Sequence, residues 1–359
     1  MKSTQLDSHP RTARTASATA DREASTSARE GVASHVAAPA AALPVALIGQ
    51  CAGWFQMRRE GEAIILEPRQ PLPRRCTIRP AAMFDHDRGF ADIMTVMGRL
   101  VFPRESTEAV TYTPFTRDPQ RRLREVFLPV EAMPDDDWPM SVARWSNHQA
   151  IAKRLLSVTG VAWGGLSQNE MERLTTFGGW TEPLEGCILH ALTQATVGKG
   201  ECVIEIGSFR GRSLAMLALA LRGARSDAKL LSVDPHTELP HNAQHVRNAL
   251  AEWGEERRLM QHIGPSDEAH RLLRPGCASF IFIDGDHSFD AVVKDFENYR
   301  DLLAPGGVMA FHDYGCGPHN GREEADHEVR PAVDEHVFRD PRFRPLLLAH
   351  TLMVFRRGE

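Results

Sequence analysis

The sequence predicts an α/β protein whose second half is an open sheet of mostly parallel strands with helices between them. Three observations support this class. An apolar strand, a glycine turn and the start of a helix follow one another in residues 203–213. A second apolar strand, residues 230–233, follows at the distance expected of one strand–helix–strand unit. Residues 279–283 form a continuous apolar run, which is typical of a strand that is buried on both faces.

The turn after the first strand indicates a nucleotide-containing cofactor with a positive charge. This strand ends in Glu205, and the chain turns through Gly207 and Gly211 into a helix over residues 213–221. Glycines in such a turn let the backbone approach a ligand, although they can also serve packing alone. A dinucleotide turn has a glycine in the place of Glu205, where a carboxylate would repel the pyrophosphate, so NAD-dependent oxidoreduction ranks last. S-adenosylmethionine carries a sulfonium and an ammonium group, and it suits a carboxylate at this point.

The next two strands also end in polar side chains. Asp234 ends the second strand and can accept hydrogen bonds from both hydroxyls of a ribose. The third strand, residues 259–263, is followed by Ser266 and Asp267, which can reach the edge of an adenine. In doubly wound folds the ligand crevice lies at the carboxyl ends of the strands, so these side chains are predicted to share one surface. Each of them could instead cap a helix.

The fourth and fifth strands carry the candidate chemistry. The fourth ends in Asp284, with His287 three residues further on, and the fifth ends in His312 and Asp313. Because neighbouring strands lie about 5 Å apart, the two aspartates could share one divalent cation or one proton. The alternative roles for His287 are a helix cap and support of the ligands, and for Asp286 a cap of the following helix is favoured.

Taken together, these motifs resemble the small-molecule methyltransferases of the methyltransferase 24 family. Relatives of this family include metal-dependent macrolide-sugar O-methyltransferases and, more distantly, the catechol type. The resemblance covers roughly residues 160–357 and implies a Rossmann-like seven-stranded methyltransferase sheet. The motifs that carry it are Ile204-Glu-Ile-Gly-Ser-Phe-Arg-Gly-Arg-Ser213, Val233-Asp-Pro-His236, Phe282-Ile-Asp-Gly-Asp-His-Ser288, Leu303-Ala-Pro-Gly-Gly307 and Ala310-Phe-His-Asp-Tyr314.

The resemblance also implies a role for each candidate residue. Asp284 and Asp313 would be ligands of a divalent metal, magnesium or manganese, and His287 would be the general base. Several relatives have an acidic residue where this chain has His312, and an imidazole ligand shifts the preference from magnesium towards manganese, iron or zinc. We include His312 among the predicted metal ligands; the alternative is that it points away from the site. The predicted contacts of S-adenosylmethionine are Glu205, Gly207, Ser208 and Gly211 around its methionine end, Asp234 at its ribose, and Ser266 and Asp267 at its adenine.

The predicted function is an S-adenosylmethionine-dependent O-methyltransferase acting on a small polyhydroxylated acceptor, such as a sugar, a glycoside or another natural product. Methyl transfer to a hydroxyl needs an oxygen nucleophile close to the methyl group and a base for its proton. Two alternatives stay open. One is a cofactor-binding scaffold or regulator without catalysis, and the other is a metal-dependent hydroxylase or hydrolase that uses the same Asp and His residues.

The composition limits which binding partners and which cellular compartment are expected. The 47 acidic and 42 basic residues nearly balance, so neither nucleic acid nor an anionic membrane surface is expected as a partner. The six cysteines form no C-x-x-C pair, which predicts reduced thiols in a cytoplasmic protein. No apolar run reaches the length of about 18 residues that a transmembrane helix needs. The sequence leaves the oligomeric state open, a homo-oligomer included.

Three segments of different composition are predicted. Residues 1–42 are rich in Ala, Ser, Thr and Arg and should be disordered. Short apolar runs such as 63–66 predict that residues 43–157 form an accessory domain, β-rich or mixed, with a helix over 141–156 leading out of it. Residues 158–359 form the methyltransferase domain.

Further elements are predicted on both sides of the core strands. Ser167 and Glu170 have the spacing of a capping box that opens a helix, and a second helix is predicted over residues 182–196. Two alternating runs within residues 343–355 predict an antiparallel pair of strands that completes the sheet. The polar, glycine-containing segment 315–330 is predicted to be a lid over the acceptor.

Overall fold

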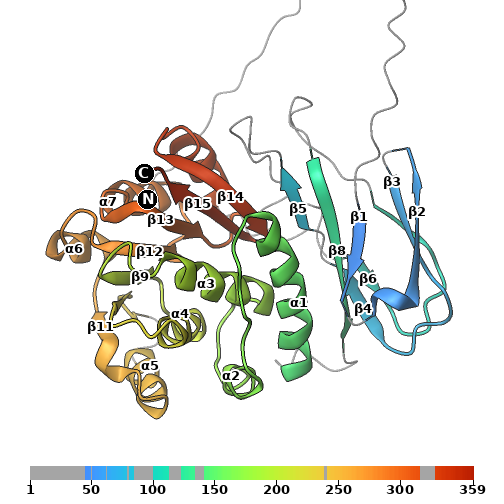
Figure 1. Cartoon of the computed structure of the whole chain (residues 1–359), viewed down its shortest axis with the longest axis horizontal. Coiled ribbons are helices and arrows are strands. Elements are labelled where there is room, and N and C mark those ends of the chain that lie inside the picture. Colours follow the sequence, from blue (N-terminus) through green and yellow to red (C-terminus); the bar gives the residue numbers. More distant parts are fainter. Residues whose placement is uncertain are drawn as a thin grey trace, which may run out of the picture. The chain divides into compact units, whose positions relative to one another are not determined.

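The structure is a computed structural model of the 359-residue chain. The residues that it describes all lie within one compact unit, Leu43–Glu359 (Figure 1). The predicted disordered tail, residues 1–42, lies outside the described residues, and so does most of the predicted lid. The described ranges are 45–49, 51–61, 63–78, 81–84, 100–112, 123–133, 141–237, 241–315 and 328–359.

The described part of the N-terminal region is rich in β-strands, as the sequence predicts. One sheet contains β1 (Val45–Ile48), β4 (Arg75–Ile78), β5 (Ala81–Phe84), β6 (Leu100–Phe102) and β8 (Leu123–Met133), and a second contains β2 (Phe55–Glu60), β3 (Ala63–Pro68) and β7 (Val110–Tyr112), with the 3-10 turn η1 (Ala52–Trp54) before β2. Strand β8 pairs in parallel with β1 and antiparallel with β4 and β5. The predicted run 63–66 lies in β3, where Ile64 and Leu66 are buried.

The C-terminal part contains the predicted seven-stranded sheet, in the order β11-β10-β9-β12-β13-β15-β14. Its strands are β9 (Cys202–Ile206), β10 (Lys229–Val233), β11 (Leu259–His262), β12 (Ala278–Ile283), β13 (Leu303–Phe311), β14 (Phe343–Ala349) and β15 (Leu352–Arg357). Strands β9 to β13 pair in parallel, and β15 is antiparallel to β13 and β14. This is the order of a doubly wound sheet completed by an antiparallel hairpin, so the predicted Rossmann-like fold is confirmed.

Helices cover both faces of this sheet, and its central strands are therefore apolar on both sides. The helices are α1 (Val142–Val158), α2 (Gln168–Leu174), α3 (Pro183–Thr196), α4 (Arg212–Gly223), α5 (Asn242–Glu252), α6 (Ser266–Ala269), α7 (Phe289–Tyr299) and α8 (Val329–Ala332), with the short turns η3 (Glu256–Arg258), η4 (His270–Leu272) and η6 (Val333–Val337). Val203 and Phe280 belong to a core shared with α1 to α5. Ile204 and Ile281 point to the other face, into a core shared with α6, α7 and α8.

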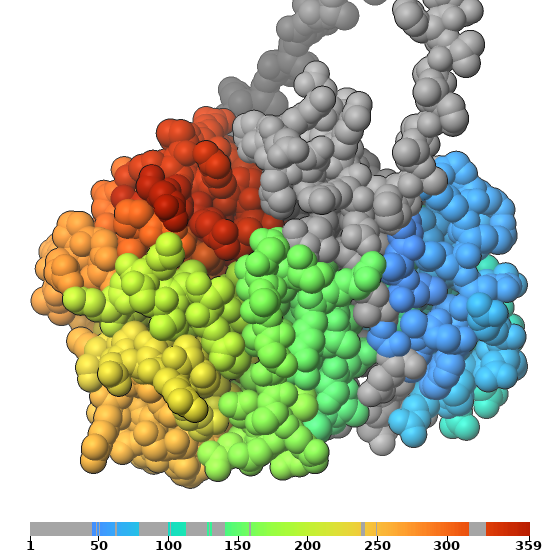
Figure 2. All heavy atoms as spheres, in the orientation of Figure 1, coloured from blue at the N-terminus to red at the C-terminus, as the bar shows by residue number. Residues whose placement is uncertain are grey.

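Helix α1 adds to the helical layer of the sheet. Ser141 caps it by accepting a hydrogen bond from the backbone N–H of Arg144 at 3.2 Å. Trp145 is fully buried against Gly186 of α3, where a Cβ would lie only 3.0 Å from the indole ring. On the face that Figure 2 shows, α1 lies between the N-terminal strands in blue and the other helices of the sheet. The domain boundary between residues 157 and 158 stays a prediction.

The two helices before strand β9 begin at capping boxes. Ser167 and Glu170 open α2, which confirms the predicted motif. Helix α3 begins after Glu182, whose backbone N–H donates to the carboxylate of Glu185 at 2.9 Å. Among the described helices, none combines the length and the apolar character that a membrane crossing needs.

Candidate functional site

The register of the sheet brings the ends of four parallel strands to one edge. Ile206 of β9 pairs with Val233 of β10 and with Ile283 of β12, and Ile283 pairs with Phe311 of β13. The alignment continues past the strand ends, because the backbone N–H of Asp284 donates to the carbonyl of Ile206 at 2.8 Å. The candidate residues that directly follow these strands are therefore neighbours.

Glu205 is a buried carboxylate near the end of β9. It has no exposed surface, and neither of its carboxylate oxygens has a hydrogen bond of good geometry. Burial, with smaller contributions from the charges of Asp284 and Asp234, raises the pKa of Glu205 to about 8, against the lowering effect of nearby serine hydroxyls. A buried carboxylate without a partner is unfavourable for stability, and a cationic ligand would stabilise its ionised form. Such a group is typical of a binding site.

Packing explains both glycines of the turn. Gly207 has a φ of +84°, and a Cβ there would lie 1.9 Å from the carbonyl oxygen of Asp284. Gly211 has a φ of +86° and precedes α4, and its Cβ would lie 2.8 Å from Val246. A side chain at either position would collide and strain the backbone. The glycines therefore place the turn against β12 and α5, and they would be needed with or without a cofactor.

Asp234 holds the turn that follows β9. Its Oδ2 accepts a hydrogen bond from the backbone N–H of Phe209 at 2.8 Å, and its Oδ1 accepts one from the N–H of His236 at 2.6 Å. A carboxylate has about four acceptor positions, so capacity for ribose hydroxyls remains. The buried hydroxyl of Ser208 lies 2.6 Å from that of Ser232 and is engaged inside the protein.

Ser266 and Asp267 attach the short helix α6 to α7. The hydroxyl of Ser266 donates to Asp295 at 2.5 Å, and the hydroxyl of Tyr299 donates to the carbonyl of Ser266 at 2.8 Å. Asp267 pairs with Lys294 at 2.5 Å. Both side chains already have partners on α7, so their predicted role at the adenine stays a prediction.

Asp295 is a buried acid that the sequence analysis missed. It is 4% exposed, and burial raises its pKa to about 6 against the lowering effect of the Ser266 hydroxyl. Asp295 lies on α7 between Val292, Phe296 and Tyr299, which are all buried. This spacing marks the face of a helix that is turned to the core. An acidic residue at a core-facing position was the signal that could have revealed it.

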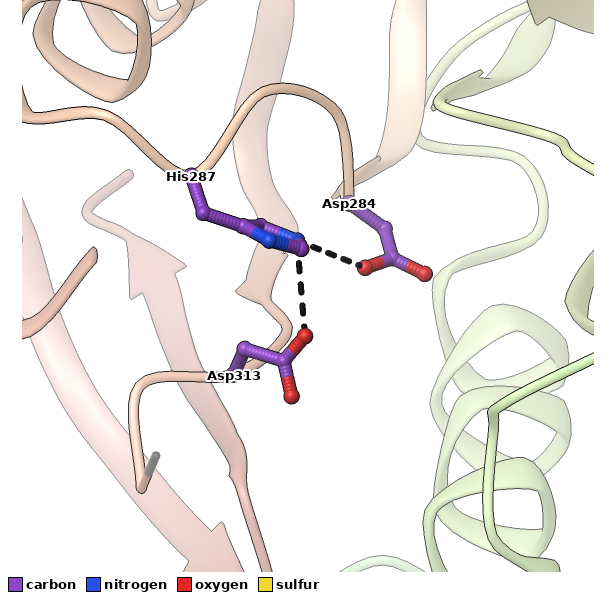
Figure 3. Close-up of side chains that lie close together, drawn as sticks. All are labelled: Asp284, His287 and Asp313. Atoms are coloured by element: carbon purple, nitrogen blue, oxygen red, sulfur yellow. Dashed lines mark ion pairs between the residues drawn. The ribbon is translucent and has the colours of Figure 1, made fainter. Parts of the chain in front are cut away.

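Asp284, His287 and Asp313 form a cluster where β12 and β13 end. One donor atom from each lies within 4.8 Å of the others. Figure 3 shows the ring of His287 directed at both carboxylates. Its Nε2 lies 3.4 Å from Oδ2 of Asp313 and 3.8 Å from Oδ1 of Asp284. Asp313 has a φ of 54°, a strained conformation of the kind that collects at functional sites.

His312 faces the same two carboxylates from inside the protein. It is 4% exposed, and its Nδ1 lies 3.0 Å from Oδ1 of Asp284 and 3.2 Å from Oδ2 of Asp313. Its Nε2 lies 3.1 Å from Oε2 of Glu185. Burial opposes the charged ring, but the three surrounding carboxylates raise the pKa of His312 well above its usual value. The alternative that His312 points away from the cluster is therefore wrong.

Most distances in this cluster are those expected between neighbouring ligands of a small cation. The four carboxylate-to-imidazole distances are 3.0, 3.2, 3.4 and 3.8 Å. Bonds of about 2.1 Å would separate neighbouring ligands by roughly 3.0 to 3.4 Å in octahedral or tetrahedral geometry. The distances of His312 to both aspartates lie within this range, whereas the 3.8 Å between His287 and Asp284 lies outside it. Asp284, Asp313 and His312 therefore fit a divalent cation, and a donor set with imidazole favours manganese, iron or zinc over magnesium. The same spacing suits direct ion pairs with charged imidazoles, so a metal titration has to distinguish the two.

The strand order and the residues at the strand ends define a class I methyltransferase domain. Residues 204–314 match a family model described as a methyltransferase domain, methyltransferase 24. The matched segment runs from β9 to the turn after β13 and contains every candidate site residue that the sequence predicted. The chain thus carries a methyltransferase domain of the methyltransferase 24 family.

Individual relatives are distant. An uncharacterized protein of Acanthamoeba polyphaga mimivirus is 28% identical over 116 residues, which are 31% of this chain and 50% of that protein. The chain therefore spans about half the length of this curated relative. An O-methyltransferase of Bacillus cereus in complex with SAH is 18% identical with a TM-score of 0.44, covering 60% of this chain and 100% of that one. An apo TDP-rhamnose 3'-O-methyltransferase of calicheamicin biosynthesis is 16% identical with a TM-score of 0.41, covering 62% and 97%.

Proposed function

We propose that this protein is an S-adenosylmethionine-dependent O-methyltransferase that acts, with a divalent cation, on a hydroxyl of a small polyhydroxylated acceptor. One observation carries the proposal. A buried carboxylate without a hydrogen-bond partner, Glu205, shares a sheet edge with the cluster of Asp284, His287 and Asp313. The first group suits a cationic cofactor, and the second suits the activation of a hydroxyl.

The cofactor half of the site rests on β9, β10 and the turn between β9 and α4. When bound, S-adenosylmethionine supplies a methyl group on a positively charged sulfur. Glu205 would compensate positive charge at the methionine end, and Asp234 would accept hydrogen bonds from the ribose hydroxyls. Asp234 also fixes the Phe209 amide at 2.8 Å, so the ribose site and the turn are held by one side chain.

The acceptor half rests on the ends of β12 and β13. Asp284 and Asp313 would hold the divalent cation, with His312 as a third donor. A cation at this place lowers the pKa of a hydroxyl bound to it. Held by Asp284 and Asp313, the cation would bind two adjacent hydroxyls of the acceptor, which is why a polyhydroxylated molecule such as a sugar, a glycoside or another natural product is proposed.

His287 is proposed as the group that accepts the proton of the attacking hydroxyl. Burial opposes its charged form, but a hydrogen bond to Asp284 and the charge of Asp313 raise its pKa. The raised pKa makes the neutral ring a stronger base for the proton of the attacking hydroxyl. His287 is partly exposed, with 31% of its side-chain surface accessible, so an acceptor can reach it.

The partners and the compartment follow from the same proposal. A cytoplasmic enzyme with a small-molecule acceptor needs neither nucleic acid nor a membrane surface, and the balance of 47 acidic and 42 basic residues supports this.

The test begins with cofactor binding to the full chain. Calorimetric titration should show binding of S-adenosylmethionine and no binding of NAD. Transfer of a labelled methyl group is then measured on a panel of sugars and glycosides with magnesium, with manganese and with EDTA. Cofactor binding without transfer to any hydroxyl would favour a scaffold or regulator, and failure to bind S-adenosylmethionine would refute the proposal.

A further inference from the structure

Glu185 is the most heavily bonded buried acid near the candidate site. It lies in the first turn of α3 and has no exposed surface. A capping box needs only one bond from this side chain, to the backbone N–H of Glu182. Glu185 makes further contacts, with the residue that follows β13 and with the turn between β14 and β15. Its partners are the N–H of Glu182 at 2.9 Å and His312 Nε2 at 3.1 Å on Oε2, and the N–H of Thr351 at 3.0 Å, the hydroxyl of Thr351 at 2.6 Å and His350 Nδ1 at 2.9 Å on Oε1.

The contact with Glu185 decides which nitrogen of His312 carries a hydrogen. An ionised carboxylate can only accept, so Nε2 of His312 must be the donor. Both oxygens of Glu185 already accept hydrogen bonds, from the N–H of Glu182 at 2.9 Å and from the N–H of Thr351 at 3.0 Å, so this side chain is an acceptor towards His312 as well. A cation bound at the cluster would displace the proton from Nδ1, because an imidazole nitrogen binds a metal only through its lone pair. This lone pair faces the carboxylates of Asp284 and Asp313.

Nδ1 of His312 is close to these oxygens but is not satisfied by them. It lies 3.0 Å from Asp284 and 3.2 Å from Asp313, yet it makes no hydrogen bond of good geometry. The ring is also held from the side, because Phe282 packs edge-on against it with 6.0 Å between the ring centroids. A proton on Nδ1 and a metal cation are therefore alternatives at this point, and once the proton is displaced, Nδ1 and the two carboxylates present three donors to one cation.

We propose that Glu185 is a positioning residue that holds His312 with Nδ1 as the third donor beside Asp284 and Asp313, and thereby makes the site prefer manganese over magnesium. The inference rests on the cation of the proposed function. Histidines that bind metals usually donate their other N–H to a carboxylate, which fixes the ring and makes the free nitrogen a better ligand. Magnesium prefers oxygen ligands, whereas manganese accepts imidazole more readily.

The test compares variants at Glu185 with a matched control on the same carboxylate. Glu185→Gln keeps the shape of the side chain but removes the charge that accepts from His312. Thr351→Val removes a hydrogen bond to Oε1, at 2.6 Å, and leaves Oε2 and its contact with His312 in place. Both variants lose a buried bond, so both should lose stability. Only the first should change the cation site.

The measurement is calorimetric titration of the full chain with manganese and with magnesium, without cofactor or acceptor. Glu185→Gln should lose roughly 10-fold to 100-fold in manganese affinity, with a much smaller loss for magnesium. For Thr351→Val we expect both affinities to stay within about threefold of wild type. Equal manganese affinity in Glu185→Gln and wild type, or equal losses in both variants, would overturn the inference.

A second variant keeps the inference testable if Glu185→Gln does not fold. His312→Gln keeps an N–H donor for Glu185 and removes Nδ1, so it should lose the preference for manganese as well. Manganese binding at wild-type strength in this variant contradicts the assignment. The titration needs no methyl transfer. If the wild type transfers methyl groups but binds no manganese, only this inference is refuted. If the chain does not bind S-adenosylmethionine, only the proposed function is refuted.

Discussion

Replacing Glu205 with Gln should stabilise the free protein and weaken its binding of S-adenosylmethionine. Glu205 is fully buried, and its pKa of about 8 lies above the value of 4.5 for an exposed glutamate. At pH 7 the carboxyl group therefore takes up a proton when the chain folds. Each pKa unit corresponds to about 1.4 kcal/mol, so this proton uptake costs about 3 kcal/mol of folding free energy at pH 7. The Glu205→Gln variant avoids this cost.

The pH dependence of the effect has a definite sign. A pKa that is raised in the folded state contributes stability that is fully present below about pH 4.5 and is lost as the pH rises towards 8. The Glu205→Gln variant does not titrate at this position. The difference in unfolding free energy between the two proteins should therefore grow from under about 1 kcal/mol at pH 5 to about 4 kcal/mol at pH 8.

The assay is urea denaturation at pH 5, 7 and 8, combined with calorimetric titration of S-adenosylmethionine. Glu201→Gln is the matched control, because this exposed residue lies just before the same strand, and its substitution should change stability by less than about 0.5 kcal/mol. A Glu205→Gln variant that is no more stable than wild type at pH 8 would show that the carboxyl group has a partner in solution. An unchanged dissociation constant would remove Glu205 from the cofactor site.

Three further predictions concern the same edge of the sheet. Binding of S-adenosylmethionine to wild type at pH 6.5 should release close to one proton, because Glu205 ionises beside the cation. Calorimetry in buffers of different ionisation enthalpy counts the released protons, and zero release would contradict the role of Glu205. Asp284→Asn should abolish turnover and keep cofactor affinity. The control Asp286→Asn keeps an acceptor for the N–H of Ser288 and should retain most of the turnover. Both variants are compared in a steady-state assay of methyl transfer, and a fully active Asp284→Asn would refute the metal site. Asp234→Ala should weaken cofactor binding. It should also lower the unfolding free energy by about 1–3 kcal/mol, because two backbone N–H groups lose their acceptor. If calorimetry shows the same affinity for S-adenosylmethionine in this variant and in wild type, Asp234 is not part of the ribose site.

The order of the strands and the residues at their ends could be predicted from the sequence. Continuous apolar runs mark strands that are buried on both faces, and the lengths between them allow only helical crossovers of one hand. Parallel strands then have to present their carboxyl ends at one edge. Glu205, Asp234, Asp284 and Asp313 were therefore identified from their places in the chain, and the register of β9, β10, β12 and β13 confirms that the ends of these strands are aligned.

The sequence could not show which of these side chains are already engaged by the protein. Ser208 bonds Ser232, and Ser266 bonds Asp295, in contacts that join residues 24 and 29 positions apart. The pattern of residue types at a strand end is the same whether a hydroxyl faces a ligand or a neighbouring helix. Only the packing of α6 on α7 and the pairing of β9 with β10 decide between the two.

The sequence by itself determined the sheet, its helical connections and the carboxylates at the strand ends, because local periodicity and the topology of parallel strands leave few other arrangements. The tertiary structure alone decided the surroundings of His312. Glu185 lies 127 positions away from His312 in the chain, in a helix that begins with an ordinary capping box. Packing of α3 across the ends of β13 and β15 joins the two side chains, and contacts between residues so far apart leave no local signal in the sequence.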